Sequence, residues 1–219
     1  ADGPPPHGNG GVEVGADLDD PLTAHELRHV HPVRADVADR TERAALFEGS
    51  YGTADTHNVD LLLTDTLGPF GLSLEGGHFS TDGYKVVSVN RRGSVDVDAG
   101  SSHTTFNGRL EMKVSPDLTL FARGTYYEES RENGTPLQFN NTDTGSFATG
   151  GRLRTSDGSE WTVTVFGDVQ GFHSTFSSQA ADRNSETLAL DQRVPTTSVG
   201  AALTWTRAFG DHRVLAGTD

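Results

Sequence analysis

The chain has 219 residues and carries 17 Lys and Arg against 31 Asp and Glu, so its formal charge is −14. This acidic balance argues against a general nucleic-acid binder, which shows a basic patch or stripe. The absence of cysteine excludes disulfides, thiol catalysis and zinc fingers. Mean hydropathy is −0.48, and no apolar run approaches the roughly 20 residues of a transmembrane helix. A membrane β-barrel is compatible with these values, because its strands alternate between apolar and polar residues.

Residues 1 to about 42 differ from the rest of the chain. The stretch from Ala1 to Gly11 is rich in Pro and Gly, which predicts an irregular segment. A short helix is predicted from Pro21 to His31, where Thr23 is a candidate cap and Pro32 ends the helix.

The sequence HELRH within this helix fits the pattern H-E-x-x-H. On a helix, His25 and His29 would lie on one face and bind zinc, and Glu26 would activate the metal-bound water. Against this reading, Pro32 ends the helix at once and no downstream residue stands in a third-ligand motif. Adventitious metal binding through His25, His29 and His31 is the better interpretation, and a plain surface segment is better still.

From Arg43 onward the sequence has a period of two, which is the period of a strand. The clearest case is 106–114, where Phe106, Leu110, Met112 and Val114 share one face and Asn107, Arg109, Glu111 and Lys113 share the other. The pattern predicts about nine strands: 44–52, 57–66, 70–82, 104–114, 118–130, 146–155, 160–177, 197–208 and 212–219. Several of them exceed ten residues, which is long for a strand.

The connections between these strands alternate between two kinds. One set is short and rich in Pro, Gly and Asp, as in the turns 67–70, 115–117, 156–159 and 210–211. The other set is mostly long and polar, with loops predicted over 83–103, 131–145 and 178–196 and a short member near 53–56. In an up-and-down meander the two sets lie at opposite ends, which is typical of outer-membrane barrels. A soluble β-sandwich has shorter strands and does not sort its loops by end.

Aromatic residues give a second, weaker indication, because membrane barrels carry aromatic girdles at both interfaces. Near the short turns lie Phe70, Trp161, Trp205 and Phe209, and toward the long loops lie Tyr51, Phe79, Tyr84, Tyr126 and Tyr127.

Five segments in order carry a family resemblance: EGSYGT (48–53), LGPFGLSLEGG (67–77), FSTDGY (79–84), NGRL (107–110) and SPDLTL (115–120). In this order the segments resemble the start of the barrel of TonB-dependent outer-membrane receptors, over about residues 43–219. The resemblance implies a 22-stranded barrel filled by an N-terminal plug, in the outer membrane of a Gram-negative bacterium.

The resemblance also implies a function. Receptors of this kind bind a scarce nutrient, such as a ferric siderophore or cobalamin, and import it with energy delivered by the TonB complex of the inner membrane. We therefore expect no enzyme activity and no cofactor. The partners expected are outer-membrane lipid, a small metal chelate or cobalamin, and the TonB complex, reached through the missing plug; no nucleic acid is expected.

Neither a TonB box nor a plug is recognisable before Arg43, and nine strands cannot close a barrel of this type. We therefore expect a fragment, with residues 1–42 as an irregular remnant of the plug junction and 43–219 as strands one to about nine.

The candidate ligand-binding residues are Arg91 and Arg92, which could contact an anionic chelate from a long loop. We expect Arg109, Glu111, Lys113, Arg123, Arg152 and Arg154 to face the barrel interior as a structural ion-pair network. Two other functions stay open: a small zinc hydrolase using His25, Glu26 and His29, and a soluble acidic β-sandwich that acts as a binding module.

Overall fold

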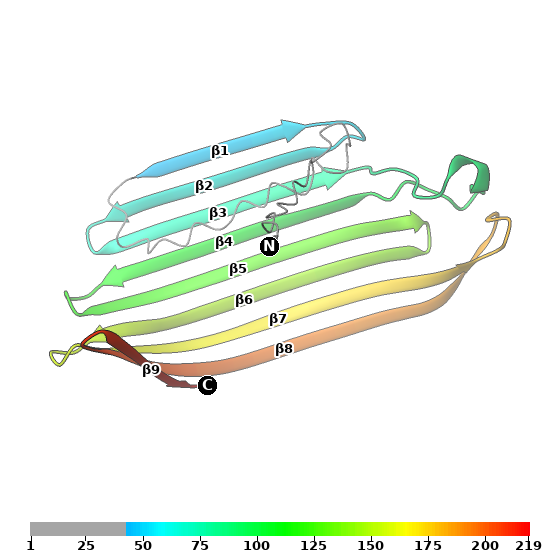
Figure 1. The fold of residues 1–219 in the computed structure, drawn as a ribbon. Coiled ribbons are helices and arrows are strands. Elements are labelled where there is room, and N and C mark those ends of the chain that lie inside the picture. The colour runs from blue at the N-terminus through cyan, green and yellow to red at the C-terminus, as the bar shows by residue number, and fades with distance from the viewer. Residues whose placement is uncertain (1–42) are drawn as a thin grey trace, which may run out of the picture. The chain divides into compact units, whose positions relative to one another are not determined.

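The computed structural model describes residues 43–219, and these form one antiparallel sheet of nine strands (Figure 1). The strands are β1 (Ala44–Tyr51), β2 (His57–Leu67), β3 (Phe70–Thr81), β4 (Ser101–Lys113), β5 (Leu118–Thr135), β6 (Gln138–Arg154), β7 (Ser159–Gln179), β8 (Glu186–Phe209) and β9 (His212–Thr218). They lie in the sheet in chain order. The expected all-β, up-and-down meander is confirmed for these residues.

Two of the three long loops predicted from the sequence are wrong, because most of their residues lie in strands. Strands β5 and β6 continue until only residues 136–137 join them, so most of the predicted loop 131–145 is strand. Strands β7 and β8 likewise leave only 180–185 of the predicted loop 178–196. Both stretches are largely polar, and their few apolar residues do not show the alternation that marks a half-buried strand. Their backbone groups nevertheless pair across the sheet, which needs no apolar face.

The register sorts the side chains into two faces, because residues directly opposite on neighbouring strands point to the same side. One face, here called the apolar face, includes the row Leu63, Leu74, Phe147 and Val199. The other is called the polar face, and it carries Arg109, Glu111, Lys113, Arg123, Arg152 and Arg154. The prediction that these six residues share one face is confirmed.

The sheet has almost no core among the described residues. Val95 and Ala148 are the buried hydrophobic residues of this part of the chain. On the apolar face at least a third of the surface stays exposed at Leu61, Leu63, Phe106, Leu110, Leu120, Tyr126, Phe147, Leu153, Trp161, Val163, Val165, Val169, Val199 and Leu203. An apolar surface of this extent marks an interaction with a protein or a membrane.

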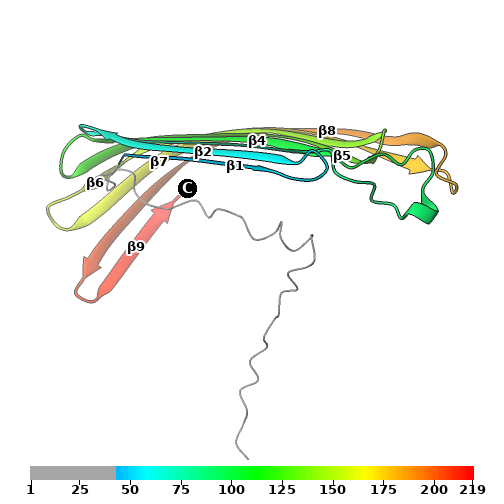
Figure 2. The ribbon, with the colours of Figure 1, turned by 90° about the horizontal axis from the view of Figure 1, so that it is seen from above.

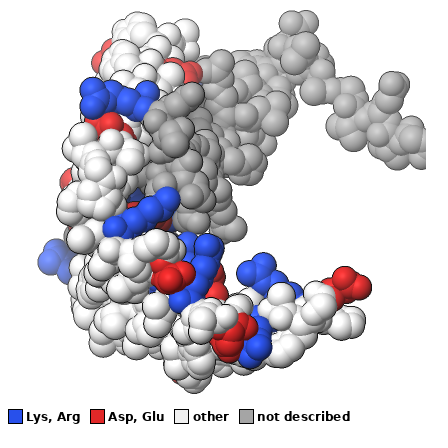
Figure 3. Space-filling model, turned by 90° about the vertical axis from the view of Figure 1, so that its left-hand side faces the viewer, with Lys and Arg blue, Asp and Glu red and all other residues white. Residues whose placement is uncertain are grey.

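The sheet is a single layer, as Figure 2 shows, and it is curved. Figure 3 looks along the sheet from the end with the short connections, where most Lys, Arg, Asp and Glu side chains lie on the hollow side. Some large apolar side chains also lie on the polar face. Examples are Leu46 and Leu215 in the edge strands, Phe121 and Phe166 in the inner strands, and Phe176, Leu190 and Val194 far from the short connections.

The tight turn between β6 and β7 shows how the short connections are built. Gly158 has a φ of 82°, a conformation that favours glycine. The Asp157 carboxylate accepts hydrogen bonds from the Thr155 hydroxyl (2.5 Å), the Ser159 amide and hydroxyl (3.0 Å each) and the Arg207 guanidinium (2.9 Å). These bonds, the one from Thr155 first, lower the pKa of Asp157 to about 2.

An aromatic cluster lies beside this turn on the apolar face. Trp161 and Trp205 are directly opposite, with ring centroids 6.3 Å apart, and Phe209 lies 6.4 Å from Trp205. The Arg207 guanidinium lies over the Phe209 ring at 4.9 Å. The predicted placement of these aromatic residues near the short turns is confirmed.

Strand β8 has an open edge along most of its length. Only Leu203–Phe209 pairs with β9, so within the described residues 186–202 pair with β7 alone. Pro195 lies in this stretch, opposite Gly171. A proline within a sheet is confined to such edges, because it has no N–H to donate.

Candidate functional site

The candidate site lies at the end of the sheet where the connections β3–β4, β5–β6 and β7–β8 come together. The β3–β4 connection (82–100) is the long one, and it contains the 3-10 helix η2 (Val89–Arg91). Its Val97 amide donates to the Gly134 carbonyl (3.1 Å), and its Val95 amide donates to the Arg183 carbonyl (3.1 Å). The long connection therefore contacts both of its neighbours, although it is far from each of them in the sequence.

A charged pair fastens this contact. The Arg183 Nε lies 2.9 and 3.0 Å from the two carboxylate oxygens of Asp96, and its Nη2 lies 2.5 Å from Oδ1. The Asp96 side chain is 1% exposed and also accepts from the Gly93 amide at 2.7 Å. The hydrogen bonds from Arg183 hold the pKa of Asp96 below its usual range. We call residues 93–96 with Arg183 and Asn184 the clasp.

Backbone geometry supports the clasp. Ser94 donates its amide to the Asn184 side chain (3.0 Å) and its hydroxyl to the Asn184 carbonyl (3.1 Å). Arg183 has a φ of 55°, which is uncommon for a residue other than glycine. A Cβ at Gly93 would lie 2.0 Å from the Arg183 carbonyl oxygen, so only glycine fits there. The charged pair joins the same two segments that meet at this close approach.

Glu186, the first residue of β8, ties the β5–β6 turn to the same region. Its carboxylate accepts from the Thr135 hydroxyl (2.5 Å), the Leu137 amide (3.3 Å) and the Ser177 hydroxyl. The three connections are therefore joined by side-chain contacts as well as by backbone hydrogen bonds.

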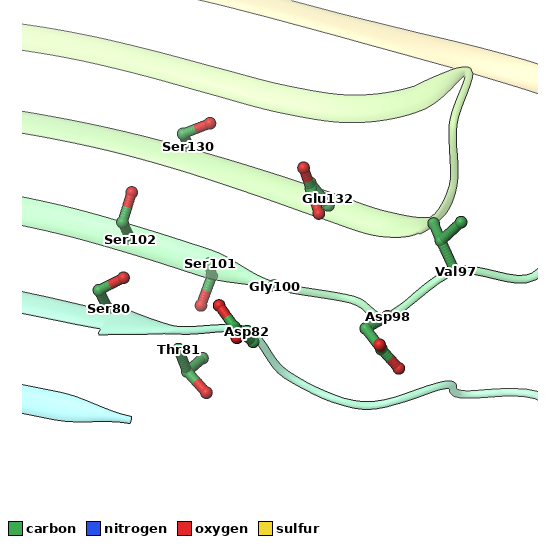
Figure 4. A pocket seen from close by; sticks show the side chains of 10 residues that line it. All are labelled: Ser80, Thr81, Asp82, Val97, Asp98, Gly100, Ser101, Ser102, Ser130 and Glu132. Carbon is green, nitrogen blue, oxygen red and sulfur yellow. The ribbon is translucent and has the colours of Figure 1, made fainter. Parts of the chain in front are cut away.

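An open cavity of about 440 Å³ lies where β3, β4 and β5 approach the long connection (Figure 4). Its lining contains five hydroxyl side chains, three carboxylates and no basic side chain: Ser80, Thr81, Asp82, Val97, Asp98, Gly100, Ser101, Ser102, Ser130 and Glu132. This lining offers hydrogen-bond acceptors and negative charge, which suit a ligand with donor groups or positive charge.

On the polar face near the same end, three rings form a stack across β3, β4 and β5. Phe79 and His103 lie 5.1 Å apart between centroids and are nearly parallel, and His103 and Tyr127 lie 6.2 Å apart. The register places Phe79 and Tyr127 on the polar face and Tyr51 and Tyr126 on the apolar face. These four aromatic residues, predicted to lie toward the long loops, are therefore divided between the two faces of the sheet.

The two predicted arginines lie at the tip of the long connection. Arg91 ends η2 and is exposed. The Arg92 guanidinium donates to the carbonyls of Val87 (2.6 Å) and Lys85 (3.3 Å), so it holds the loop together. Neither residue lines the cavity. Their role in ligand binding stays a prediction.

The predicted zinc ligands His25, Glu26 and His29 lie outside the described residues. Within residues 43–219 there is no group of three or more His, Asp or Glu side chains that could hold a metal ion. The same residues contain no helix long and apolar enough to cross a membrane.

Sequence reasoning missed the clasp, the ring stack and the cavity. Asp96 and Arg183 are 87 residues apart and stand in no motif. The ring stack was accessible in principle, because Phe79 and His103 become neighbours once the register of β3 and β4 is known.

No model of a known protein family matches the chain, and no curated protein matches its sequence. The class of protein is therefore defined by the fold of residues 43–219: an all-β chain with one open, nine-stranded, up-and-down sheet.

Proposed function

We propose that the chain is part of a TonB-dependent outer-membrane receptor of a Gram-negative bacterium, and that it serves energised uptake of a ferric siderophore or cobalamin. The observation that carries the membrane part of this proposal is the apolar face. It is continuous over the sheet, it has no covering layer among residues 43–219, and the opposite face is charged. In a transmembrane barrel the first face would contact lipid and the second would face the interior.

The height of the apolar band supports this reading. On β5 the band runs from Leu118 to Tyr126 and on β7 from Trp161 to Val169, which is eight residue steps in both strands. At about 3.4 Å per residue this is roughly 27 Å along the strand. A tilt of about 40° reduces it to roughly 21 Å along the membrane normal, close to the typical band of about 25 Å.

The position of the aromatic residues also supports a membrane–water interface at each edge of the band. Trp161, Trp205 and Phe209 lie at the lower edge of the band, and Tyr126 lies at its upper edge. Trp and Tyr rings prefer the headgroup region because they combine an apolar body with a polar tip.

Beyond the band, strands β5 to β8 continue as a polar extension. Nine more residues of β5 follow Tyr126 before the strand ends at Thr135, which is about 30 Å of chain. The extension, together with the ends of β3 and β4 and the long connection between them, carries the clasp, the acidic cavity and the ring stack. In the proposed receptor it would project from the outer surface and form part of the ligand mouth. The ring stack, which faces inward, would contact an apolar or aromatic part of the nutrient.

The receptor class and the nutrient rest on the family resemblance. Nine strands with this polar face would require further strands to enclose an interior. The family resemblance implies that these strands belong to a closed barrel of 22. The sandwich alternative would need a second sheet, and residues 43–219 form one. Nothing in the described residues favours the zinc hydrolase.

The membrane part is tested with the full chain reconstituted into vesicles of phosphatidylcholine brominated at defined acyl positions. The chain contains two tryptophans. Because both lie at the edge of the band, bromine near the headgroups should quench their fluorescence more than bromine near the bilayer centre. Trp161→Phe and Trp205→Phe variants assign the quenching to each ring. A chain that is folded and monodisperse in plain buffer and is not quenched by any lipid would contradict the proposal.

The uptake part has a separate test, which is deletion of the gene in the producing bacterium. We expect poor growth when iron or cobalamin is limiting, and full growth when excess ferric chloride or cyanocobalamin is supplied. Unchanged growth under both limitations would remove the uptake function and leave the membrane result standing.

A further inference from the structure

Two histidine rings lie beside each other on neighbouring strands. His57 is the first residue of β2, and His78 lies toward the end of β3. The register sets His57 opposite Ser80 and His78 opposite Val59, so the two histidines are diagonal neighbours on the apolar face. Their ring centroids are 5.7 Å apart, and the ring planes are tilted by 38°. We call His57 and His78 the histidine pair.

Each ring of the pair is held through its Nδ1 atom. The Nδ1 of His57 lies 3.1 Å from the Asp55 carbonyl oxygen, and the Nδ1 of His78 lies 2.9 Å from the Thr104 hydroxyl. A carbonyl oxygen only accepts hydrogen bonds, so in the neutral His57 ring Nδ1 carries the proton and Nε2 carries the lone pair. The Thr104 hydroxyl can accept from His78 in the same way. Among residues 43–219 neither Nε2 atom has a hydrogen-bond partner.

The turn before β2 sets the position of the Asp55 carbonyl. Ala54 and Asp55 have φ values of 55° and 50°, which are uncommon for residues other than glycine. The turn is joined to the end of β3, where the Asp82 amide donates to the Ala54 carbonyl at 2.8 Å. Backbone strain of this kind is concentrated at functional sites. The group that anchors the His57 ring is therefore part of a turn that is itself tied to the sheet.

The separation of the two rings matches that of two imidazoles on one metal ion. Zinc binds imidazole nitrogen at about 2.0–2.1 Å, which places each ring centroid roughly 3.2 Å from the metal and two centroids roughly 5–6 Å apart at near-tetrahedral angles. The histidine pair lies in that range. A metal-binding histidine usually donates its other ring N–H to a fixed acceptor, and both rings of the pair have such an acceptor at Nδ1.

The histidine pair is open to water and lies just outside the apolar band. His78 is exposed and His57 is half-buried. His78 lies one row beyond Gly76, which is in line with Phe106 and Tyr126 at the upper edge of the band. Residues 43–219 contain no group of three or more His, Asp or Glu side chains that could hold a metal ion. The described residues therefore offer two ligands at this place, and water would complete the coordination.

We propose that His57 and His78 bind one divalent transition-metal ion, such as Zn²⁺ or Cu²⁺, through their Nε2 atoms, with Thr104 as a positioning residue. Neutral imidazole suits these ions, whereas Mg²⁺ and Ca²⁺ prefer oxygen ligands. The bound ion links β2 to β3 beside the turn at Ala54. The inference rests on the histidine pair alone and is independent of the uptake function.

Modification by diethyl pyrocarbonate tests the proposal on the full chain, because this reagent acylates free imidazole nitrogen. The chain is treated in detergent at increasing concentrations of zinc chloride, digested and analysed by mass spectrometry. We expect zinc to protect His57 and His78 with one common midpoint, and magnesium chloride to protect neither. Peptides that contain His25, His29 and His31 report separately on metal bound by the HELRH segment. Protection of only one residue of the pair, or of neither at millimolar zinc, overturns the proposal.

His78→Gln removes one of the two ligands. Loss of even an outer partner of a metal site weakens binding about 10–100-fold, so protection of His57 should require at least about tenfold more zinc in this variant. The control is His212→Gln, because His212 is exposed on β9 and has no second histidine beside it among residues 43–219. Its midpoint should stay within about twofold of the wild-type value, as expected for a distant site. A midpoint at His57 that is the same in His78→Gln and in the wild type overturns the pair.

Thr104→Val tests the positioning of His78 without removing a ligand. The substitution keeps the shape of the side chain and removes the hydroxyl, so it should raise the zinc midpoint about tenfold. Thr105→Val makes the same change on the opposite face of β4 and should leave the midpoint unchanged. Equal midpoints in these two variants contradict the proposed role of Thr104.

Discussion

Between Leu118 and Tyr126, strand β5 places apolar and polar side chains on opposite faces, whereas between Tyr127 and Thr135 both faces are polar. The backbone pairing continues through both regions with neighbours β4 and β6 until the irregularity near Glu132. The first region has an exposed apolar face, which in the proposed receptor would contact lipid. The second region is suited to water and is fastened by specific ties, chiefly Asp96–Arg183 and the contacts of Glu186. The same ladder of hydrogen bonds thus carries two patterns of side chains, one apolar on a single face and one polar on both faces.

The largest expected effect tests the first region. Val165 is central in the apolar band of β7, and in the proposed membrane Val165→Arg should lower the free energy of unfolding by about 2–4 kcal/mol. Ser130→Arg places the same side chain on the same face in the polar extension and should change it by no more than about 0.5 kcal/mol. Urea unfolding in lipid vesicles, followed by tryptophan fluorescence, compares the two. Equal effects of the two substitutions would show that the band does not contact lipid.

The second region is tested through the clasp. Asp96→Asn removes the charge that holds Arg183, so hydrogen exchange should become faster in 83–100 and 180–185 and stay unchanged in β4 and β7 near the short connections. Gly93→Ala should have the same local effect through the clash with the Arg183 carbonyl. Mass spectrometry of peptic peptides measures both. Unchanged exchange in the two connections would show that the charged pair does not order them.

The smallest effect concerns the turn at Asp157, which lies at the end opposite the clasp. Because folding lowers the pKa of Asp157 to about 2, its contribution to stability is fully present above its unfolded pKa of about 3.9 and is lost as the pH falls through 2. Protonation weakens the contact with Arg207, which lies next to the Trp205 cluster. We therefore expect a change in tryptophan fluorescence with a midpoint near pH 2.

Thr155→Ala provides the control for this titration. The Thr155 hydroxyl contributes most to the lowered pKa, so its removal should move the fluorescence midpoint to higher pH. A midpoint that is the same in both proteins would assign the titration to another carboxyl group.

The sequence predicted the fold well wherever the two faces differ in polarity. Strands β3, β4 and β7 were found within about three residues at either end, because Leu74, Leu110 and Val163 alternate with polar neighbours. The early parts of β6 and β8 were missed because Asn140, Thr142 and their neighbours are polar on both faces. In those parts the pairing partner, and not the local pattern, determines the strand.

The candidate site was predicted less well. Arg91 and Arg92 were chosen for their charge in a long loop, but the cavity nearby is acidic and lies at the base of that loop. The clasp depends on two residues 87 positions apart, and its geometry depends on the length of the strands between them. The charged residues of the polar face were predicted to share one face, but the pairing of Arg109 with Arg123 could be seen only once the register of β4 and β5 was known.

Pro195 bears on strand addition along the part of β8 that has no second neighbour among residues 43–219. An exposed edge presents unpaired backbone groups and can template the addition of a strand from another copy. Pro195 interrupts this edge, since its ring nitrogen gives an incoming strand no hydrogen to accept. A strand from a second chain that paired along this edge would lose one backbone hydrogen bond at Pro195. The pyrrolidine ring would also push that strand out of register. Wherever the rest of the protein leaves residues 186–202 of β8 unpaired, Pro195 would therefore oppose strand addition from another copy.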